Sequence, residues 1–222
     1  KSAIFRSRWL PYALLAPQVA VLAVFFFWPA VQALGQAFFI SDAFGGNARF
    51  VGFDNFTRLL ASREYRQSFL GTLVFSAATA GLSMGMGLLF ALLASRAVNA
   101  TTAVRSLLIW PYAVAPAVAG ALWMFVFNPT MGVLAHALNR FTTLGWDPTL
   151  NPAHAMTLLV LAAAWKQVSY NFVFFLAGLQ AIPQSLVEAA AIDGAGPVRR
   201  CFAIVLPLLS PTSFFLAVMN VV

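Results

Sequence analysis

Charged residues are scarce in this chain: they make up 9% of its 222 residues, whereas hydrophobic residues make up 61%. Soluble domains carry about 25% charged residues. A chain this apolar cannot cover a water-soluble core with polar side chains, and its mean hydropathy of +0.85 is typical of proteins that cross a membrane several times. The net charge of +7 comes from basic residues scattered between apolar runs. There they orient spans in the membrane, so the charge does not predict nucleic-acid binding.

Cysteine and histidine are also rare. The single cysteine, Cys201, excludes an intrachain disulfide. The two histidines, His136 and His154, lack the spacing of metal ligands, and each falls near the outer end of a predicted span. We therefore expect no metal site, solvated histidines, and a small buried residue at Cys201.

Sequence signatures of catalysis are missing as well. The sequence has no Gly-x-x-x-x-Gly-Lys-Ser/Thr loop for binding phosphates and no recognisable pair of nucleophile and base. We expect the chain not to be an enzyme, to bind no cofactor of its own, and to hydrolyse no ATP.

What the sequence does contain is a series of apolar runs long enough to span a bilayer, which predicts an all-α fold, a polytopic transmembrane helical bundle. The first run covers residues 10–40 and is about twice as long as the roughly 7–15-residue core of a signal peptide. Pro17 and Pro29 are expected to kink it or to mark its ends. The other runs cover residues 69–95, 106–127, 154–181 and 206–222.

Glycine and proline positions predict how two of these runs behave. Gly81 and Gly85 have the small-xxx-small spacing that permits close helix packing, and Gly87 follows them. Pro111 and Pro116 interrupt the third run, which is tolerated where a neighbouring helix or a cavity satisfies the freed carbonyls. A short helix is also expected over residues 54–60, inside the polar segment 41–68.

Between the fourth and fifth runs lies a polar stretch that is more than a turn. Ser185 with Glu188 three residues later predicts a capping box at the start of a helix. Gly194 or Gly196 would supply a bend, and Pro197 suits the first position of a second helix. The pattern predicts a helix–turn–helix between two membrane spans.

This stretch resembles the EAA loop, the cytoplasmic coupling loop of ABC-importer permeases. The family pattern is Glu-Ala-Ala, a Gly six residues after the Glu, and Ile-x-Leu-Pro ten residues after the Gly. The chain fits it without a gap at Glu188, Ala189, Ala190, Gly194, Ile204, Leu206 and Pro207. The resemblance implies that residues 183–207 dock in a cleft on a cytoplasmic ATPase subunit. The residues that it implicates in coupling are Glu188, Ala189, Ala190, Asp193, Gly194, Arg199 and Arg200.

Three further stretches, residues 6–12, 111–119 and 165–172, resemble the A-type permease subunit of the sn-glycerol-3-phosphate importer. This resemblance implies a heterodimer with a sister permease, two copies of the ATPase that binds ATP and magnesium, and a periplasmic substrate-binding protein. General sugar permeases share similar proline and tryptophan positions. A related importer for neutral oligosaccharides or polyols therefore remains the alternative.

The resemblance covers the whole chain, so we expect residues 1–222 to form one transmembrane domain of the type I ABC importer permease kind. Permeases of this family have at least one more span, and the sequence has no initiator Met. We therefore expect a chain trimmed at its start, with five spans, the last truncated, and with C-terminal spans missing. Four predicted spans separate the N-terminus from the coupling loop, so both lie on one side. The resemblance places that side in the cytoplasm, at the bacterial inner membrane.

One face of the fourth run predicts the translocation path. Lys166 lies near the middle of that run, where an ionisable residue is costly and indicates function. Gln167, Tyr170, Asn171 and Phe174 share a helical face, as residues three and four apart do. We predict that Lys166 and this face line the path. In the alternative interpretation Lys166 reaches towards an interface or pairs with the sister subunit, and Asn171 bonds to a neighbouring helix.

An ion-coupled secondary transporter is the alternative from another class. Such proteins place carboxylates near the middle of the membrane. None of the six acidic residues falls inside a predicted span, which argues against that class.

Overall fold

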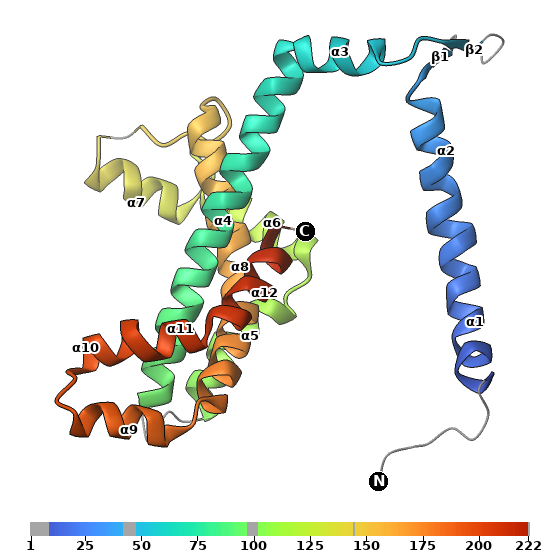
Figure 1. Cartoon of the computed structure of the whole chain (residues 1–222). Coiled ribbons are helices and arrows are strands. Elements are labelled where there is room, and N and C mark those ends of the chain that lie inside the picture. The colour runs from blue at the N-terminus through green and yellow to red at the C-terminus, as the bar shows by residue number, and fades with distance from the viewer. Residues whose placement is uncertain (1–8, 42–47, 97–101, 144, 222) are drawn as a thin grey trace. The chain divides into compact units, whose positions relative to one another are not determined.

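The computed structural model describes residues 9–41, 48–96, 102–143 and 145–221. It divides into two compact units, Lys1–Leu70 and Gly71–Val222, and each is described by itself. In the described residues nearly every element is helical, and one small two-stranded sheet is the exception (Figure 1). The predicted all-α transmembrane class is confirmed. The basic residues Lys1, Arg6 and Arg8 lie outside the described residues.

The first apolar run is a single helical rod in the first unit. Its parts are α1, Leu10–Leu22, the π-helix η1, Ala23–Phe27, and α2, Trp28–Gln36. Proline has no N–H, and its ring collides with the carbonyl four residues back in a regular α-helix. The wider π-turn ends two residues before Pro29 and lets the helix continue past this proline. Leu10–Gln36 is long and apolar enough to cross a membrane.

A small sheet follows the rod, and the sequence did not predict it. Strands β1, Phe39–Ser41, and β2, Ala48–Phe50, pair antiparallel, with Phe39 opposite Phe50. The predicted short helix is confirmed as α3, Asp54–Ala61.

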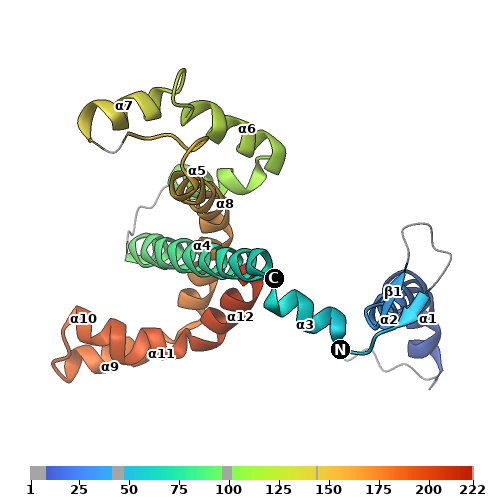
Figure 2. The ribbon, with the colours of Figure 1, turned by 90° about the horizontal axis from the view of Figure 1, so that it is seen from above.

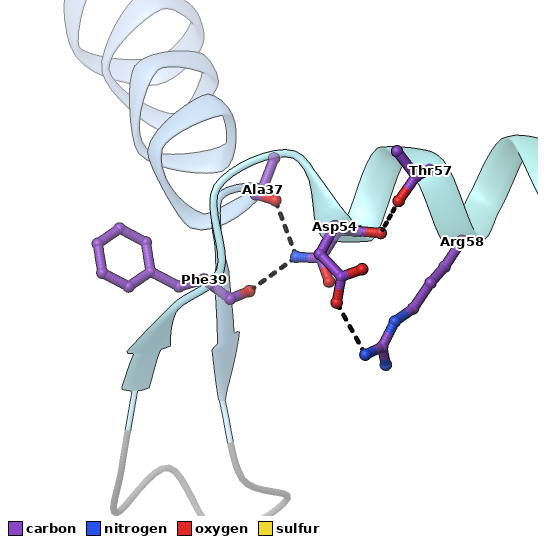
Figure 3. A network of polar contacts seen from close by, with 6 residues as sticks. Ala37, Phe39, Asp54, Thr57 and Arg58 are labelled. Carbon is purple, nitrogen blue, oxygen red and sulfur yellow. Dashed lines mark hydrogen bonds and ion pairs between the residues drawn. The ribbon is translucent and has the colours of Figure 1, made fainter.

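A side chain of α3 bonds to the backbone that follows the rod. The amide of Asn55 donates to the carbonyls of Ala37, over 2.9 Å, and of Phe39, over 3.1 Å (Figure 3). On α3 itself, Arg58 pairs with Asp54 at 2.7 Å. The described part of the polar segment, from residue 48 onward, therefore has a defined structure in place of an open loop.

Helix α4, Arg63–Arg96, begins earlier than the second apolar run. Its first turns include Arg63, Glu64 and Arg66, which were expected in the preceding loop. The part from Gly71 onward belongs to the second unit.

The second unit is built around α8, Pro152–Ala181, which confirms the fourth predicted run. Its neighbours are α4, α5, Thr102–Ala113, α6, Pro116–Val126, and α12, Ser210–Val221 (Figures 1 and 2). The largest buried cluster joins α4, α8, the residue just before α12 and the middle of α12. Its members are Ala91, Ala94, Phe172, Phe175, Leu176, Leu209 and Leu216.

Two of the five predicted spans are bent. The chain turns by 102° between α5 and α6, just before Pro116, and by 66° between Pro197–Leu208 and Ser210–Val221. Pro111 lies inside α5 without breaking it. The described residues contain three unbroken candidate spans, or five if each bent pair is one span. The fifth predicted run, expected from Leu206, is thus divided at Leu209.

The segment between α6 and α8 is folded around Trp146 and contains α7, Val133–Phe141, which the sequence did not predict. The indole N–H of Trp146 donates to the carbonyl of Phe127 over 3.2 Å. His154 stacks on Trp146, with ring centroids 5.0 Å apart, and its Nδ1 accepts the Asp147 N–H. His154 is therefore half-buried and packed, not solvated as expected.

Candidate functional site

The predicted helix–turn–helix is present as a hairpin, which we call the coupling hairpin, residues 184–208. Its helices are α9, Gln184–Ile192, α10, Pro197–Arg200, the π-helix η2, Cys201–Val205, and α11, Leu206–Leu208 (Figures 1 and 2). Gly194 has φ +80°, a conformation that glycine adopts without strain. The N–H of Ala195 donates to Ala190, and that of Gly194 to Ala191. This pair of bonds is a Schellman motif, which ends α9 and fixes the bend at Gly194.

The predicted capping box is absent, and that prediction was wrong. Pro183 occupies the N-cap with φ −59°, and α9 begins at Gln184 without a side-chain cap. Ser185 therefore lies inside the first turn, two residues after the N-cap position that a capping box with Glu188 requires. Glu188 is exposed and makes no ion pair among the described residues. Its carboxylate is thus available to a partner.

The second half of the hairpin, from Pro197 onward, follows the prediction more closely. Pro197 is the first residue of α10, and Gly196, with φ −65°, is its N-cap. The π-turn η2 ends two residues before Pro207, as η1 ends two residues before Pro29, so this proline is also accommodated by a widened turn. Of the seven residues implicated in coupling, five are exposed and two, Ala190 and Arg200, are half-buried.

A cavity of about 610 Å³ separates the coupling hairpin from the ends of α4 and α8. The Nε atom of Arg200, a lining residue, is buried without a hydrogen-bond partner in the structure. Cys201 also lines the cavity and is half-buried, not buried as expected. The remaining walls include Leu92, Leu179, Ile182 and Glu188.

Lys166 reaches the broken span. Its Nζ donates to the carbonyl of Val114 over 2.8 Å, and Val114 lies at the turn between α5 and α6. Beside it, Trp165 contacts Trp110 of α5 and Trp123 of α6, with ring centroids 6.2 and 5.9 Å apart. Lys166 therefore has a partner within this chain, at the turn between α5 and α6.

Asn171 is fully buried, at 0% exposure, between three helices. Its amide nitrogen donates to Ser83 of α4 over 3.0 Å and to Asn220 of α12 over 3.2 Å. Asn220 returns a bond of 2.9 Å to the Asn171 oxygen. Asn171 therefore makes the helix–helix contact that the sequence left open as its alternative. Sequence reasoning missed Ser83 and Asn220, although both are polar residues in apolar runs.

Of the three glycines that the sequence singles out in α4, Gly87 makes the close helix contact. A Cβ on Gly87 would lie 2.7 Å from the Cβ of Asn171, whereas one on Gly81 or Gly85 would meet nothing within 4 Å. The prediction for Gly81 and Gly85 is wrong within this chain. The face of α4 that packs inward consists of small buried residues every three or four positions: Thr79, Ser83, Gly87, Ala91 and Ala94.

The remaining residues of the predicted path form a separate stripe of α8. Gln167 and Tyr170 are half-buried, and Phe174 is 36% exposed. The ring of Tyr170 stacks on Tyr112 of α5, at 6.2 Å, and contacts Phe174, at 4.6 Å. These side chains are thus more accessible than Asn171. Among the described residues no group of three His, Cys, Asp or Glu could hold a metal ion.

A family model matches residues 3–222, and its description is binding-protein-dependent transport system inner membrane component. The chain is 57% identical over 219 residues to the sn-glycerol-3-phosphate transport system permease protein UgpA of Rhizobium meliloti (strain 1021), covering 99% of this chain and 74% of that protein. It is 51% identical over 218 residues to the protein of the same name in Yersinia pseudotuberculosis serotype I (strain IP32953), covering 98% of this chain and 74% of the relative.

Solved structures share the fold. A bacterial ABC transporter involved in import of the acidic polysaccharide alginate matches with a TM-score of 0.76 and 24% identity, over 96% of this chain and 72% of that one. The same kind of transporter in complex with an alginate pentasaccharide-bound periplasmic protein matches with a TM-score of 0.78, also at 24% identity, over 96% of this chain and 71% of that one. At this identity the match concerns the fold alone.

Proposed function

This chain belongs to the family of binding-protein-dependent transport system inner membrane components and is a permease subunit of an ABC importer, and we propose that its substrate is sn-glycerol 3-phosphate. The observation that carries the proposal is its identity of 51–57% to permeases named for that substrate, over nearly all of this chain. A related importer for neutral oligosaccharides or polyols is the competing assignment.

The coupling hairpin, in this proposal, docks on a cytoplasmic ATPase. Its tip is rigid, because the Schellman motif at Gly194 fixes the angle between α9 and α10. Its exposed Glu188 and Arg199 are charged groups available for contacts with the ATPase. ATP and magnesium bind to the ATPase, two copies of which serve one heterodimer of this chain and a sister permease. A periplasmic binding protein delivers the substrate.

Gln167, Tyr170 and Phe174 are proposed to line the path. Gln167 and Tyr170 offer hydrogen-bond donors for a substrate with hydroxyl and phosphate oxygens. Lys166 and Asn171 use their polar groups on neighbouring helices, so we assign them to the support behind this face. Alternating access then follows: ATP binding closes the ATPase pair, the hairpins move with it, and the path opens outward to receive substrate.

The proposed orientation places the N-terminus and the coupling hairpin in the cytoplasm. It requires four crossings between them, and therefore requires that α5 and α6 together cross the membrane as one broken span. Residues 133–151, with α7 and Trp146, would then lie on the periplasmic side.

Reconstitution tests this function. The full-length chain is assembled with its sister permease, ATPase and binding protein in proteoliposomes, and ATP-dependent uptake of radiolabelled sn-glycerol 3-phosphate is measured. We expect uptake that unlabelled maltose and glycerol do not compete away. An ATPase variant lacking its phosphate-loop lysine is the matched control, and this chain alone should show neither uptake nor ATPase activity. Uptake of a neutral oligosaccharide without uptake of sn-glycerol 3-phosphate would refute the assignment.

A further inference from the structure

Val114 and Ala115 lie between α5 and α6, outside both helices. The first backbone bond of α6 runs from Ala119 to the carbonyl of Ala115, and Ala115 is extended, with ψ 136°. The carbonyl of Val114 lies one residue before that first bond, and no backbone N–H of α6 donates to it. Inside a membrane no water is available to such a group, so leaving it unpaired is costly unless another donor reaches it.

Lys166 supplies that donor, from the middle of another helix. Its Nζ lies 2.8 Å from the Val114 oxygen. A positive charge is also favoured at the C-terminal end of α5, where the unpaired carbonyls give the helix a partial negative charge. The contact thus satisfies two groups that each need a partner in the membrane: an ammonium group and the carbonyl of a broken helix.

Helix α8 connects this contact to the coupling hairpin. It continues without a break from Lys166 to Ala181, a length of about 22 Å at a rise of about 1.5 Å per residue. The coupling hairpin begins three residues after Ala181, at Gln184. A displacement of the hairpin therefore acts on the end of α8, the helix whose Lys166 bonds to the turn between α5 and α6.

We propose that Lys166 is a positioning residue for transport: its hydrogen bond to Val114 ties the α5–α6 break to α8, so that movement of the coupling hairpin moves the break. The inference rests on the proposed ABC import function but not on the identity of the substrate. The bond acts as a mechanical tie, and Lys166 does not bind the substrate itself.

Two substitutions distinguish the effect of the Lys166–Val114 hydrogen bond from that of side-chain packing. In the complete importer, Lys166→Met keeps an unbranched side chain, shorter by the terminal nitrogen, and removes its donors, whereas Lys166→Arg keeps a donor and the charge. An interhelical hydrogen bond in a membrane is worth about 1–2 kcal/mol, or about five- to thirtyfold in an equilibrium. We expect Lys166→Met to lower uptake by about tenfold while ATP hydrolysis stays within about threefold, and Lys166→Arg to retain most of the uptake.

A fluorescence measurement reports the break without any substrate. Trp165 contacts one indole on each side of the break, so its emission depends on the position of α5 and α6. Subtracting the emission of the Trp165→Phe complex isolates its signal. We expect trapping with ATP and vanadate to change this signal in the original and Lys166→Arg complexes but not in Lys166→Met.

Several outcomes would overturn the proposal. One is a Lys166→Met importer with unchanged uptake and an unchanged fluorescence response. Another is loss of uptake with the fluorescence response intact, which would assign Lys166 to substrate binding. If Lys166→Met does not assemble, Lys166→Cys in a Cys201→Ser chain is treated with 2-bromoethylamine, which restores an ammonium group. Modification confirmed by mass spectrometry without recovery of uptake would also refute the tie. Failure of the original complex to import sn-glycerol 3-phosphate would refute only the substrate assignment, because the fluorescence measurement uses ATP and vanadate and no substrate.

Discussion

Asn171 and Asn220 exchange two amide hydrogen bonds, one of 2.9 Å from Asn220 to Asn171 and one of 3.2 Å in return. The pair joins α8 to α12, and the hydroxyl of Ser83 on α4 donates to Asn220 over 3.0 Å. Apolar side chains gain little from leaving lipid for a protein interface, so hydrogen bonds and close packing decide which helices associate. This polar cluster therefore selects one arrangement of three helices.

The cluster predicts a coupled loss of stability. Asn171→Leu should lower the free energy of unfolding by about 1–3 kcal/mol, because it leaves the half-buried amide of Asn220 without its Asn171 partner. Adding Asn220→Leu should cost less than the sum of the single changes. Thermal unfolding of the full-length chain in detergent measures both, with the exposed Gln180→Leu on the same helix as the control. Additive effects would contradict a direct pair.

Gly87 predicts a steric effect on the same interface. Gly87→Ala should destabilise the chain by about 1–3 kcal/mol, because the added Cβ would lie 2.7 Å from the Cβ of Asn171. Gly85→Ala meets nothing within 4 Å and is the matched control; it should be neutral or slightly stabilising. Unfolding midpoints of the two purified variants in detergent provide the comparison. Equal midpoints would mean that α4 and α8 are farther apart than this structure places them.

The turn of the coupling hairpin predicts a difference between two glycines. Gly194→Ala should cost about 1–2 kcal/mol, because φ +80° brings a Cβ too close to the following carbonyl. We expect reduced co-purification of the ATPase and reduced uptake. Gly196→Ala, at an ordinary φ of −65°, should retain both within about twofold. The reverse order of the two variants would assign the bend to Gly196.

The absence of a capping box changes the effects expected of substitutions at Ser185 and Glu188. Since Ser185 does not cap α9, Ser185→Ala should leave uptake unchanged, whereas loss of a real cap would cost about 1 kcal/mol. Glu188→Lys should abolish transport through the lost partner contact while membrane insertion stays normal. Uptake assays and ATPase co-purification of both variants check this. Normal uptake and ATPase association by Glu188→Lys would remove Glu188 from the coupling surface.

Asp147 predicts sensitivity to acid. Hydrogen bonds from the Thr149 hydroxyl and then the Thr149 N–H hold the pKa of Asp147 below its ordinary value of 3.8. A lowered folded-state pKa contributes stability above the unfolded-state pKa, and this contribution is lost as the pH falls through the folded-state value. The difference in unfolding midpoint between the original chain and Asp147→Asn should therefore be constant near pH 6 and shrink below about pH 4. A difference independent of pH would refute a charged role for Asp147.

The sequence by itself determined the membrane class, most span positions and the coupling hairpin. These depend on local properties: apolar runs of fixed length, a glycine that must adopt φ +80°, and a proline that begins a helix. Residues 154–181 and 54–60 were predicted as helices for the same reason, and the structure has them with small shifts at their ends.

Only the tertiary structure decided which polar side chain meets which partner. Helical spacing placed Gln167 and Asn171 on one face. It could not show that Ser83 of α4 and Asn220 of α12 bond to Asn171 and not to Gln167. It placed the break near Pro116 but not the donor from Lys166, which is 52 residues from Val114 in the chain. Such contacts depend on how helices pack against each other, and packing in a membrane is set by close steric fit and paired polar groups distant in sequence.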